Sequence, residues 1–376
     1  MTARLLGGVK VYSLDWHLRY GLDYAGAADL LASQGMDLVI AQNRYLPMAD
    51  SAVRSAPSDV PQSYDDRQFV EALRARGMQY YAACNLFFDP ETLARHPDAL
   101  AVDASGRVAQ PVDWYIATCP THEDYFADKL QQLETAVREL RSDGVFLGFT
   151  RFPGFWEQWL PQTSRGDWSE YCFCPRCVRL FGASTGVRVP EGPGELPGSW
   201  IRAHAYAGYV EWKTDVITAR LREIKNALRR IHPPVRIMLN TLPLGPADFG
   251  GAGREVFGQD WAKLREVVDL FEVMAYHQIL GREVSWINRI TREVKTAVDR
   301  PVLVTVQAKP FYLEGMHAGR GRSPVIPVEE FARALDAARD GGADGIVVFT
   351  WSDLLRQVLA EQDTRFVNAV RRVTRG

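Results

Sequence analysis

The chain has 376 residues, of which 47% are hydrophobic and 24% are charged, the profile of a globular protein with a large core. Its 44 basic and 46 acidic side chains give a formal net charge of -2, without the basic surplus of a nucleic-acid-binding protein. We find no leader-like apolar segment at the start and no apolar run of the roughly 18 residues needed to span a membrane. We therefore expect a cytoplasmic protein with neither a nucleic-acid nor a membrane partner, and whether it forms a homodimer stays open.

Short apolar or β-branched runs alternate with segments of helical period along the whole chain, which indicates βα units with parallel strands. Helical segments such as 66–76 and 329–339 end at a glycine, a common helix stop. These units predict an α/β fold, a (β/α)₈ TIM barrel that forms a single domain over residues 1–376. The expected strands are residues 9–12, 37–41, 79–84, 144–149, 235–240, 270–275, 302–306 and 345–349.

Three irregular insertions interrupt this alternation, at residues 47–63, 89–121 and 151–199. The segment 151–199 follows the fourth strand, and loops after the strands of a barrel lie on the face that carries active sites. We therefore expect this excursion to cover the site face. Asp143 and Asp344, each followed by glycine at the start of a strand, belong to the opposite face and are expected to be structural.

Polar and aromatic side chains follow nearly every expected strand. Aromatic planes beside amide, carboxylate and guanidinium groups suit a sugar ring, which offers apolar C–H faces and many hydroxyls. The strand ends therefore predict a site for a small carbohydrate. The residues expected to bind it are Asp15, Trp16, Asn43, Arg44, Asn85, Arg151, Trp156, Asn240, Tyr276, His277, Gln307, Lys309 and Trp351.

Three stretches of the sequence resemble a known family. Residues 143–153 read DGVFLGFTRFP and resemble the fourth-strand motif DGIxLDxxRxP of hypothetical glycosyl hydrolase-like barrels in the glycosidase superfamily. Residues 273–277 read VMAYH and resemble the sixth-strand M-x-Y-H of the same proteins, and residues 345–353 resemble their last strand. The resemblance implies a carbohydrate-active enzyme, a glycoside hydrolase.

The sequence departs from this family at Gly148, where the motif has its aspartate. Gly148 thus joins the candidate substrate-binding residues without a carboxylate, and Thr150 stands where chitinase-type barrels carry their general acid. One alternative is a sugar-binding pseudoenzyme that has lost the fourth-strand carboxylate, and another is an aspartate removed to trap a ligand. A catalytic metal at His17, His277 and Asp15 is a weaker alternative, because no H-x-H pair follows the first strand.

Hydrolysis of a glycoside needs two carboxyl groups roughly 5 to 10 Å apart. Glu272 is the first catalytic candidate, since it shares strand parity with Met274 and Tyr276, which the resemblance places on the inner face. Burial there would raise its pKa, as a general acid requires, and Glu272→Gln would then lower activity at least about a hundredfold. The alternative is a structural ion pair with Lys10 or Arg236.

Asp353 and Glu157 are the other catalytic candidates. Asp353 lies two residues after Trp351, so both could share one subsite, although Asp353 could instead cap the final helix. Glu157 lies among aromatic residues that could equally pack a loop. We expect Glu272 and Asp353 to face one pocket at the strand ends.

The cysteine pattern predicts a metal site. Cys172, Cys174 and Cys177 form C-x-C-x₂-C, three thiolates for a tetrahedral zinc, with Cys119 as the best fourth ligand and His122 next. The pattern resembles the structural zinc site of one group of β-galactosidase barrels. We expect structural zinc and no catalytic cofactor, with free buried thiols as the alternative.

Overall fold

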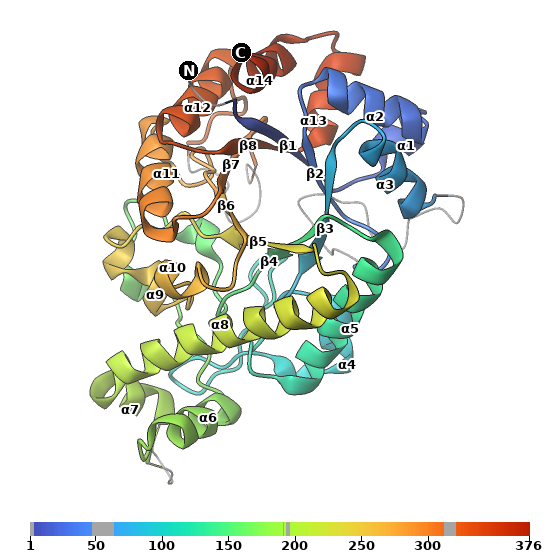
Figure 1. The fold of residues 1–376 in the computed structure, drawn as a ribbon. Coiled ribbons are helices and arrows are strands. Elements are labelled where there is room, and N and C mark those ends of the chain that lie inside the picture. Colours follow the sequence, from blue (N-terminus) through green and yellow to red (C-terminus); the bar gives the residue numbers. More distant parts are fainter. Residues whose placement is uncertain (1–3, 47–63, 191, 193–195, 312–320) are drawn as a thin grey trace.

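The structure, a computed structural model, describes residues 4–46, 64–190, 192, 196–311 and 321–376. Its eight strands are all parallel and close into a barrel in chain order, β1 to β8 (Figure 1). The predicted fold class, a (β/α)₈ barrel with a long insertion after the fourth strand, is confirmed. The strands are β1 (Leu6–Val11), β2 (Leu38–Ala41), β3 (Gln79–Asn85), β4 (Gly144–Gly148), β5 (Arg236–Thr241), β6 (Leu270–Met274), β7 (Val302–Gln307) and β8 (Gly345–Phe349).

Strand β1 begins three residues before the prediction, whereas the other strands agree with it to within one residue at either end. The prediction missed the start of β1 because Gly7 and Gly8 lie there, and glycine is rare in strands. A Cβ on Gly7 would lie only 2.1 Å from the carbonyl oxygen of Gly35. Glycine is needed there because the chain before β2 passes directly against β1.

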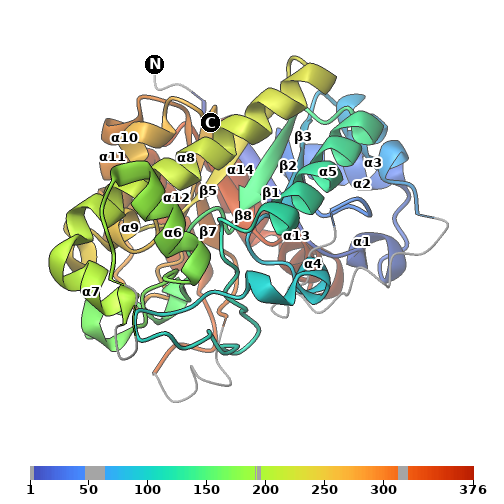
Figure 2. The same cartoon turned by 90° about the horizontal axis from the view of Figure 1, so that it is seen from below.

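The helices surround the barrel (Figures 1 and 2). The expected helices 66–76 and 329–339 appear as α3 and α12, and Gly77 follows α3 with a φ of 73°. None of the helices in the described ranges is long and apolar enough to cross a membrane. The helices are α1 (Asp15–Leu18), α2 (Tyr24–Ser33), α3 (Asp66–Arg74), α4 (Pro90–Arg95), α5 (Glu123–Leu140), α6 (Pro175–Thr185), α7 (Pro197–His204), α8 (Tyr206–Ile231), α9 (Ala252–Glu255), α10 (Trp261–Leu264), α11 (Ser285–Val298), α12 (Val328–Asp340), α13 (Trp351–Leu355) and α14 (Arg365–Arg375).

The segment 151–199 is not irregular throughout, because it contains α6 and the start of α7. These two helices pack against α8 on its side away from the barrel (Figure 1). The predicted insertion 89–121 contains α4, and the insertion 47–63 lies outside the described residues.

Four aspartates join the strands in pairs at the amino-terminal face of the barrel. Each directly precedes an even-numbered strand, and its carboxylate accepts a hydrogen bond from a backbone N–H of the strand before it. The structural role predicted for two of them is confirmed. The bonds are Gly7 N–H to Asp37 (2.9 Å), Tyr80 N–H to Asp143 (2.9 Å), Ile237 N–H to Asp269 (2.9 Å) and Val302 N–H to Asp344 (2.7 Å).

Candidate functional site

A cavity opens at the carboxyl ends of the strands, with about 650 Å³ of empty space including its solvent-open mouth. The space that water-sized molecules can occupy inside it is about 70 Å³, below the roughly 300–1,000 Å³ of most small-molecule sites. Most of the lining is aromatic, with a few polar groups between the rings. The lining residues are Lys10, Tyr12, Asn85, Phe88, Trp114, Phe146, Gly148, Phe149, Arg151, Trp156, Glu157, Asn240, Met274, Tyr276, Ile279, Phe311 and Phe349.

The structure brings together only part of the set predicted from the strand ends. The lining includes the candidate carboxylate Glu157 and six predicted binding residues, Asn85, Gly148, Arg151, Trp156, Asn240 and Tyr276. The remaining predicted binding residues do not line the cavity. They are Asp15, Trp16, Asn43, Arg44, His277, Gln307, Lys309 and Trp351.

Several of these residues have structural contacts instead. The indole N–H of Trp351 donates to the side chain of Gln34 at 2.9 Å, and its ring packs near Trp16 with the ring centroids 6.2 Å apart. Both rings are buried. The expectation that Trp351 shares a sugar subsite with Asp353 is therefore wrong, because its ring belongs to the packing between α1 and α13.

Most of the other predicted binding residues outside the cavity have polar contacts within the fold. Oδ1 of Asn43 accepts hydrogen bonds from backbone N–H groups of the turn that follows it. Asp15 is the first residue of α1. The other contacts are Arg44 with Asp66 at 2.7 Å, His277 Nε2 with Glu330 at 2.9 Å, and Gln307 Oε1 with the N–H of Ile279 at 3.3 Å.

Glu272 lies inside the barrel, as its strand parity predicts, but it does not line the cavity. Its carboxylate forms an ion pair with Lys10 at 2.9 Å, accepts from the Asn240 amide at 2.5 Å and also accepts from the Thr305 hydroxyl. Since β1 and β6 are not neighbours in the barrel, the ion pair crosses the interior. Of the two roles considered for Glu272, the structural ion pair with Lys10 has the observed geometry.

Asp353 also lies outside the cavity lining, so the expectation that it shares one pocket with Glu272 is wrong. Its carboxylate accepts from the backbone N–H and the hydroxyl of Thr350, at 3.1 and 2.8 Å, and pairs with Lys309 at 3.1 Å. Asp353 thus has a capping role, but at α13 and not at the final helix α14, because Thr350 is the N-cap and Asp353 completes the capping box as the third residue of α13.

Glu157 is the candidate carboxylate that lines the cavity. A short 3₁₀ turn, Trp156–Gln158, presents its side chain, which is 6% exposed. Beside it the ring of Trp156 lies 6.0 Å from that of Tyr276, centroid to centroid. An acidic group therefore stands in the cavity next to aromatic surface.

Arg151 is almost completely buried in the same cavity, with 2% of its surface exposed. Its guanidinium carbon lies 4.8 Å from the centroid of the Phe149 ring. Burial lowers the pKa of Arg151, and the charges of Tyr115 and Glu157 oppose that shift. Its Nε and Nη2 atoms have no hydrogen-bond partner within the described ranges.

Phe149, directly after β4, has a φ of 54°, a left-handed value that is uncommon for a residue with a side chain. Its ring lies in the cavity wall, 4.8 Å from that of Phe88 and 5.9 Å from that of Trp114, centroid to centroid. Strained backbone of this kind clusters at binding and active sites.

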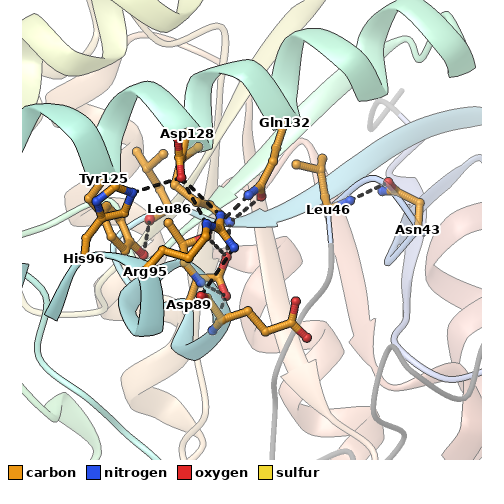
Figure 3. A network of polar contacts seen from close by, with 12 residues as sticks. Asn43, Leu46, Leu86, Asp89, Arg95, His96, Tyr125, Asp128 and Gln132 are labelled. Carbon is orange, nitrogen blue, oxygen red and sulfur yellow. Dashed lines mark hydrogen bonds and ion pairs between the residues drawn. The ribbon is translucent and has the colours of Figure 1, made fainter.

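A polar network supports the segment after β3 (Figure 3). The hydroxyl of Tyr125 on α5 donates to the carbonyl of Leu86 at 3.1 Å, and Arg95 and His96 both contact Asp128. Next to them the buried Lys129 pairs with Asp89 at 2.8 Å. These bonds fix the segment that carries Phe88 into the cavity.

The four predicted zinc ligands lie together. The sulfurs of Cys119, Cys172, Cys174 and Cys177 are buried and all within 4.8 Å of one another. Sulfurs bound to one tetrahedral zinc at about 2.3 Å lie about 3.8 Å apart, and Cys119 is 3.8 Å from Cys174 and 3.4 Å from Cys177. His122 is not a fourth ligand here, because it caps α5 and pairs with Asp98. The four thiols fit a closed metal site.

Sequence reasoning missed most of the aromatic lining. Trp114 and Phe311 come from long connecting segments, where periodicity gives no signal. Phe146 and Phe349 stand within β4 and β8, and parity with Gly148 could have indicated Phe146. Lys10 was considered only as a partner of Glu272.

Comparison with known proteins rests on structure, since neither models of protein families nor curated proteins match the sequence. The glycoside hydrolase domain of PgaB (BpsB) from Bordetella bronchiseptica has 15% identity and a TM-score of 0.64, over 96% of this chain and 98% of its own. This chain shares the fold of glycoside hydrolases.

Two further glycoside hydrolases are similar over 99% of this chain. They are a β-galactosidase from Halorubrum lacusprofundi, with 13% identity and a TM-score of 0.65, and α-L-fucosidase isoenzyme 2 from Paenibacillus thiaminolyticus, with 13% identity and a TM-score of 0.61. The chain spans 58% and 49% of their lengths. At these identities the likeness concerns the fold, and the fourth-strand motif stays a prediction.

Proposed function

We propose that this protein is a carbohydrate-active protein of the glycoside hydrolase type that binds a sugar or glycoside in the cavity at the strand ends. The observation that carries the proposal is the lining itself. Aromatic faces such as Trp156 and Tyr276 stand beside the amides of Asn85 and Asn240. These groups match the apolar faces and the hydroxyls of a sugar ring, and the glycoside hydrolase fold of the structural neighbours agrees with them.

In this proposal Glu157 is the catalytic carboxyl group, which donates a proton to the leaving oxygen or removes one from water. It is the acidic residue among the described residues that line the cavity. Glu272 and Asp353, our other candidates, act as positioning residues. Glu272 holds Lys10 and Asn240, which do line the cavity, and Asp353 holds Lys309 and Thr350 at the end of β8.

A sugar-binding protein without catalysis is the second candidate. It is favoured by Gly148 at the position of the motif's aspartate and by the single carboxylate within the described part of the lining. Hydrolysis uses two carboxyl groups, whereas binding needs neither.

The test is a screen of aryl glycosides with the wild type and Glu157→Gln. We expect at least about a hundredfold loss of kcat in the variant, the usual contribution of an acid-base group. Glu283→Gln, an exposed glutamate before α11, is the matched control and should keep the wild-type rate. A wild-type rate in Glu157→Gln would remove Glu157 from the mechanism.

Gly148→Asp separates the two candidates if the wild type cleaves none of these substrates. A Cβ on Gly148 would lie 3.0 Å from Oδ1 of Asn85, the end of a side chain that can shift. Gain of activity would identify a disabled hydrolase. Sugar binding by calorimetry without activity in either form would identify the binding protein, and no binding would refute both.

A further inference from the structure

The guanidinium of Arg151 is an unsatisfied group inside the cavity. It is 2% exposed, and burying a charge without a partner is costly, so such groups are normally paired. Within the described ranges it has no ion pair, and Nε and Nη2 donate to no acceptor. Lys10, the other cation in the lining, differs because Glu272 neutralises it at 2.9 Å.

The geometry of these two donor atoms indicates which kind of ligand group would bind them. Nε and Nη2 carry parallel N–H bonds along one edge of the planar guanidinium, and this edge matches the two oxygens of a carboxylate. Neutral hydroxyls could accept these bonds but would bring no negative charge to compensate that of the guanidinium.

A third donor lies in the same cavity. The indole N–H of Trp114 is buried and has no acceptor in the described part of the chain. The donors without acceptors on Arg151 and Trp114 call for a ligand that supplies acceptors, in a lining that also holds the carboxylate of Glu157.

We propose that the ligand of this cavity is an acidic sugar, whose carboxylate binds Nε and Nη2 of Arg151. This inference rests on the proposed carbohydrate function and names its substrate class. The aromatic rings hold the sugar ring, and Arg151 holds its charge. Arg151 therefore selects an acidic sugar over its neutral counterpart.

Calorimetric titration with glucuronate and with glucose tests the proposal, because the two sugars differ at C6 alone. We expect glucuronate to bind the wild type at least about tenfold more tightly, as a charge-assisted bidentate contact provides. Arg151→Met should abolish the preference, and Arg151→Lys, which keeps the charge but loses the paired N–H bonds, should retain only part of it.

Two controls make the result specific. Arg289→Met removes one positive charge from the outer face of α11 and should leave the preference unchanged. Arg151→Met should unfold at a temperature close to that of the wild type, because Arg151 has no hydrogen-bond acceptor among the described residues, whereas a structural arginine would lower that temperature. Glucuronate should raise the unfolding temperature of the wild type but not of Arg151→Met.

Failure of the acidic-sugar inference can be distinguished from failure of the proposed carbohydrate function. Equal affinity for glucose and glucuronate, or a preference that survives in Arg151→Met, would overturn the acidic-sugar inference and leave the carbohydrate function in place. Tighter binding of glucose 6-phosphate than of glucuronate would replace the carboxylate by a phosphate. Binding of none of the three, together with no cleavage of aryl glycosides, would overturn both proposals.

Discussion

Lys10 and Glu272 face each other across the barrel interior, both almost fully buried. The carboxylate has three partners, and two of them, Lys10 and Asn240, also line the cavity. Glu272 thus lies one layer beneath the site. It sets the positions of a cation and an amide without touching the ligand space itself.

Glu272→Gln should therefore destabilise the protein. Lys10 would lose its ion-pair partner in a buried setting, and breaking such a pair by changing one partner costs about 3–5 kcal/mol. Denaturant unfolding measures this loss. The double variant Lys10→Met with Glu272→Met should recover part of it, because no buried charge remains. Unchanged stability with a hundredfold loss of activity would instead support a catalytic role.

Sequence parity placed Glu272 inside the barrel, but it could not choose between Lys10 and Arg236 as the partner. The contact joins β1 and β6, which are distant both in the sequence and around the sheet. Similarly, the positions of Trp16 and Trp351 after strands did not reveal the direction of their rings. Side-chain direction after a strand depends on how the following helix packs.

At the scale of elements, the Asp89–Lys129 pair joins the start of α4 to α5. Burial raises the pKa of Asp89, but the charge and hydrogen bonds of Lys129, with help from Thr92, outweigh burial and hold it below its ordinary value. A carboxyl group of this kind stabilises the fold above its unfolded pKa of about 3.9, and that contribution is lost as the pH falls through the folded pKa.

We accordingly expect Asp89→Asn to be less stable than the wild type by about 3 kcal/mol at pH 7, because Lys129 is left buried without a counter-ion. The difference should begin to shrink below about pH 4, where Asp89 of the unfolded chain takes up its proton, and should be lost as the pH falls through the lower pKa of folded Asp89. Unfolding by urea at both pH values measures it. A difference independent of pH would mean that packing, not charge, dominates.

The strand-start aspartates give a second prediction for elements. Asp143→Ala should cost about 1–3 kcal/mol, because the N–H of Tyr80 loses its acceptor. Asp340→Ala, at the exposed end of α12, is the control and should change the free energy of unfolding by less than about 0.5 kcal/mol. The sequence pointed to Asp143 and Asp344 through their following glycines, and it missed Asp37 and Asp269, which precede leucine.

For the whole molecule, the four cysteines join the segment after β3 to the segment after β4. We expect one zinc per chain by elemental analysis, and Cys174→Ser should lose the metal and lower the unfolding temperature. Cys84→Ser changes a buried cysteine outside the cluster and should keep the zinc content. A zinc content near zero in the wild type would leave four free thiols.

The closed barrel followed from the sequence because the alternation of strands and helices is local and periodic. The residues that line the cavity were predicted less completely from the sequence. Its floor comes from strands, and Asn85, Asn240 and Tyr276 were predicted there, but Trp114 and Phe311 arrive on long connections whose path depends on packing.

The four aspartate hydrogen bonds divide the barrel into four βα–βα modules, each held by one such bond between its two strands. The residues before the odd-numbered strands carry no carboxylate, so within the described ranges no such hydrogen bond joins one pair of strands to the next; these residues are Leu5, Met78, Val235 and Pro301. A chain severed between β4 and β5 would thus yield two half-barrels that keep all four aspartate hydrogen bonds. A break between β3 and β4 would leave Asp143 without its donor until the pieces reassociate.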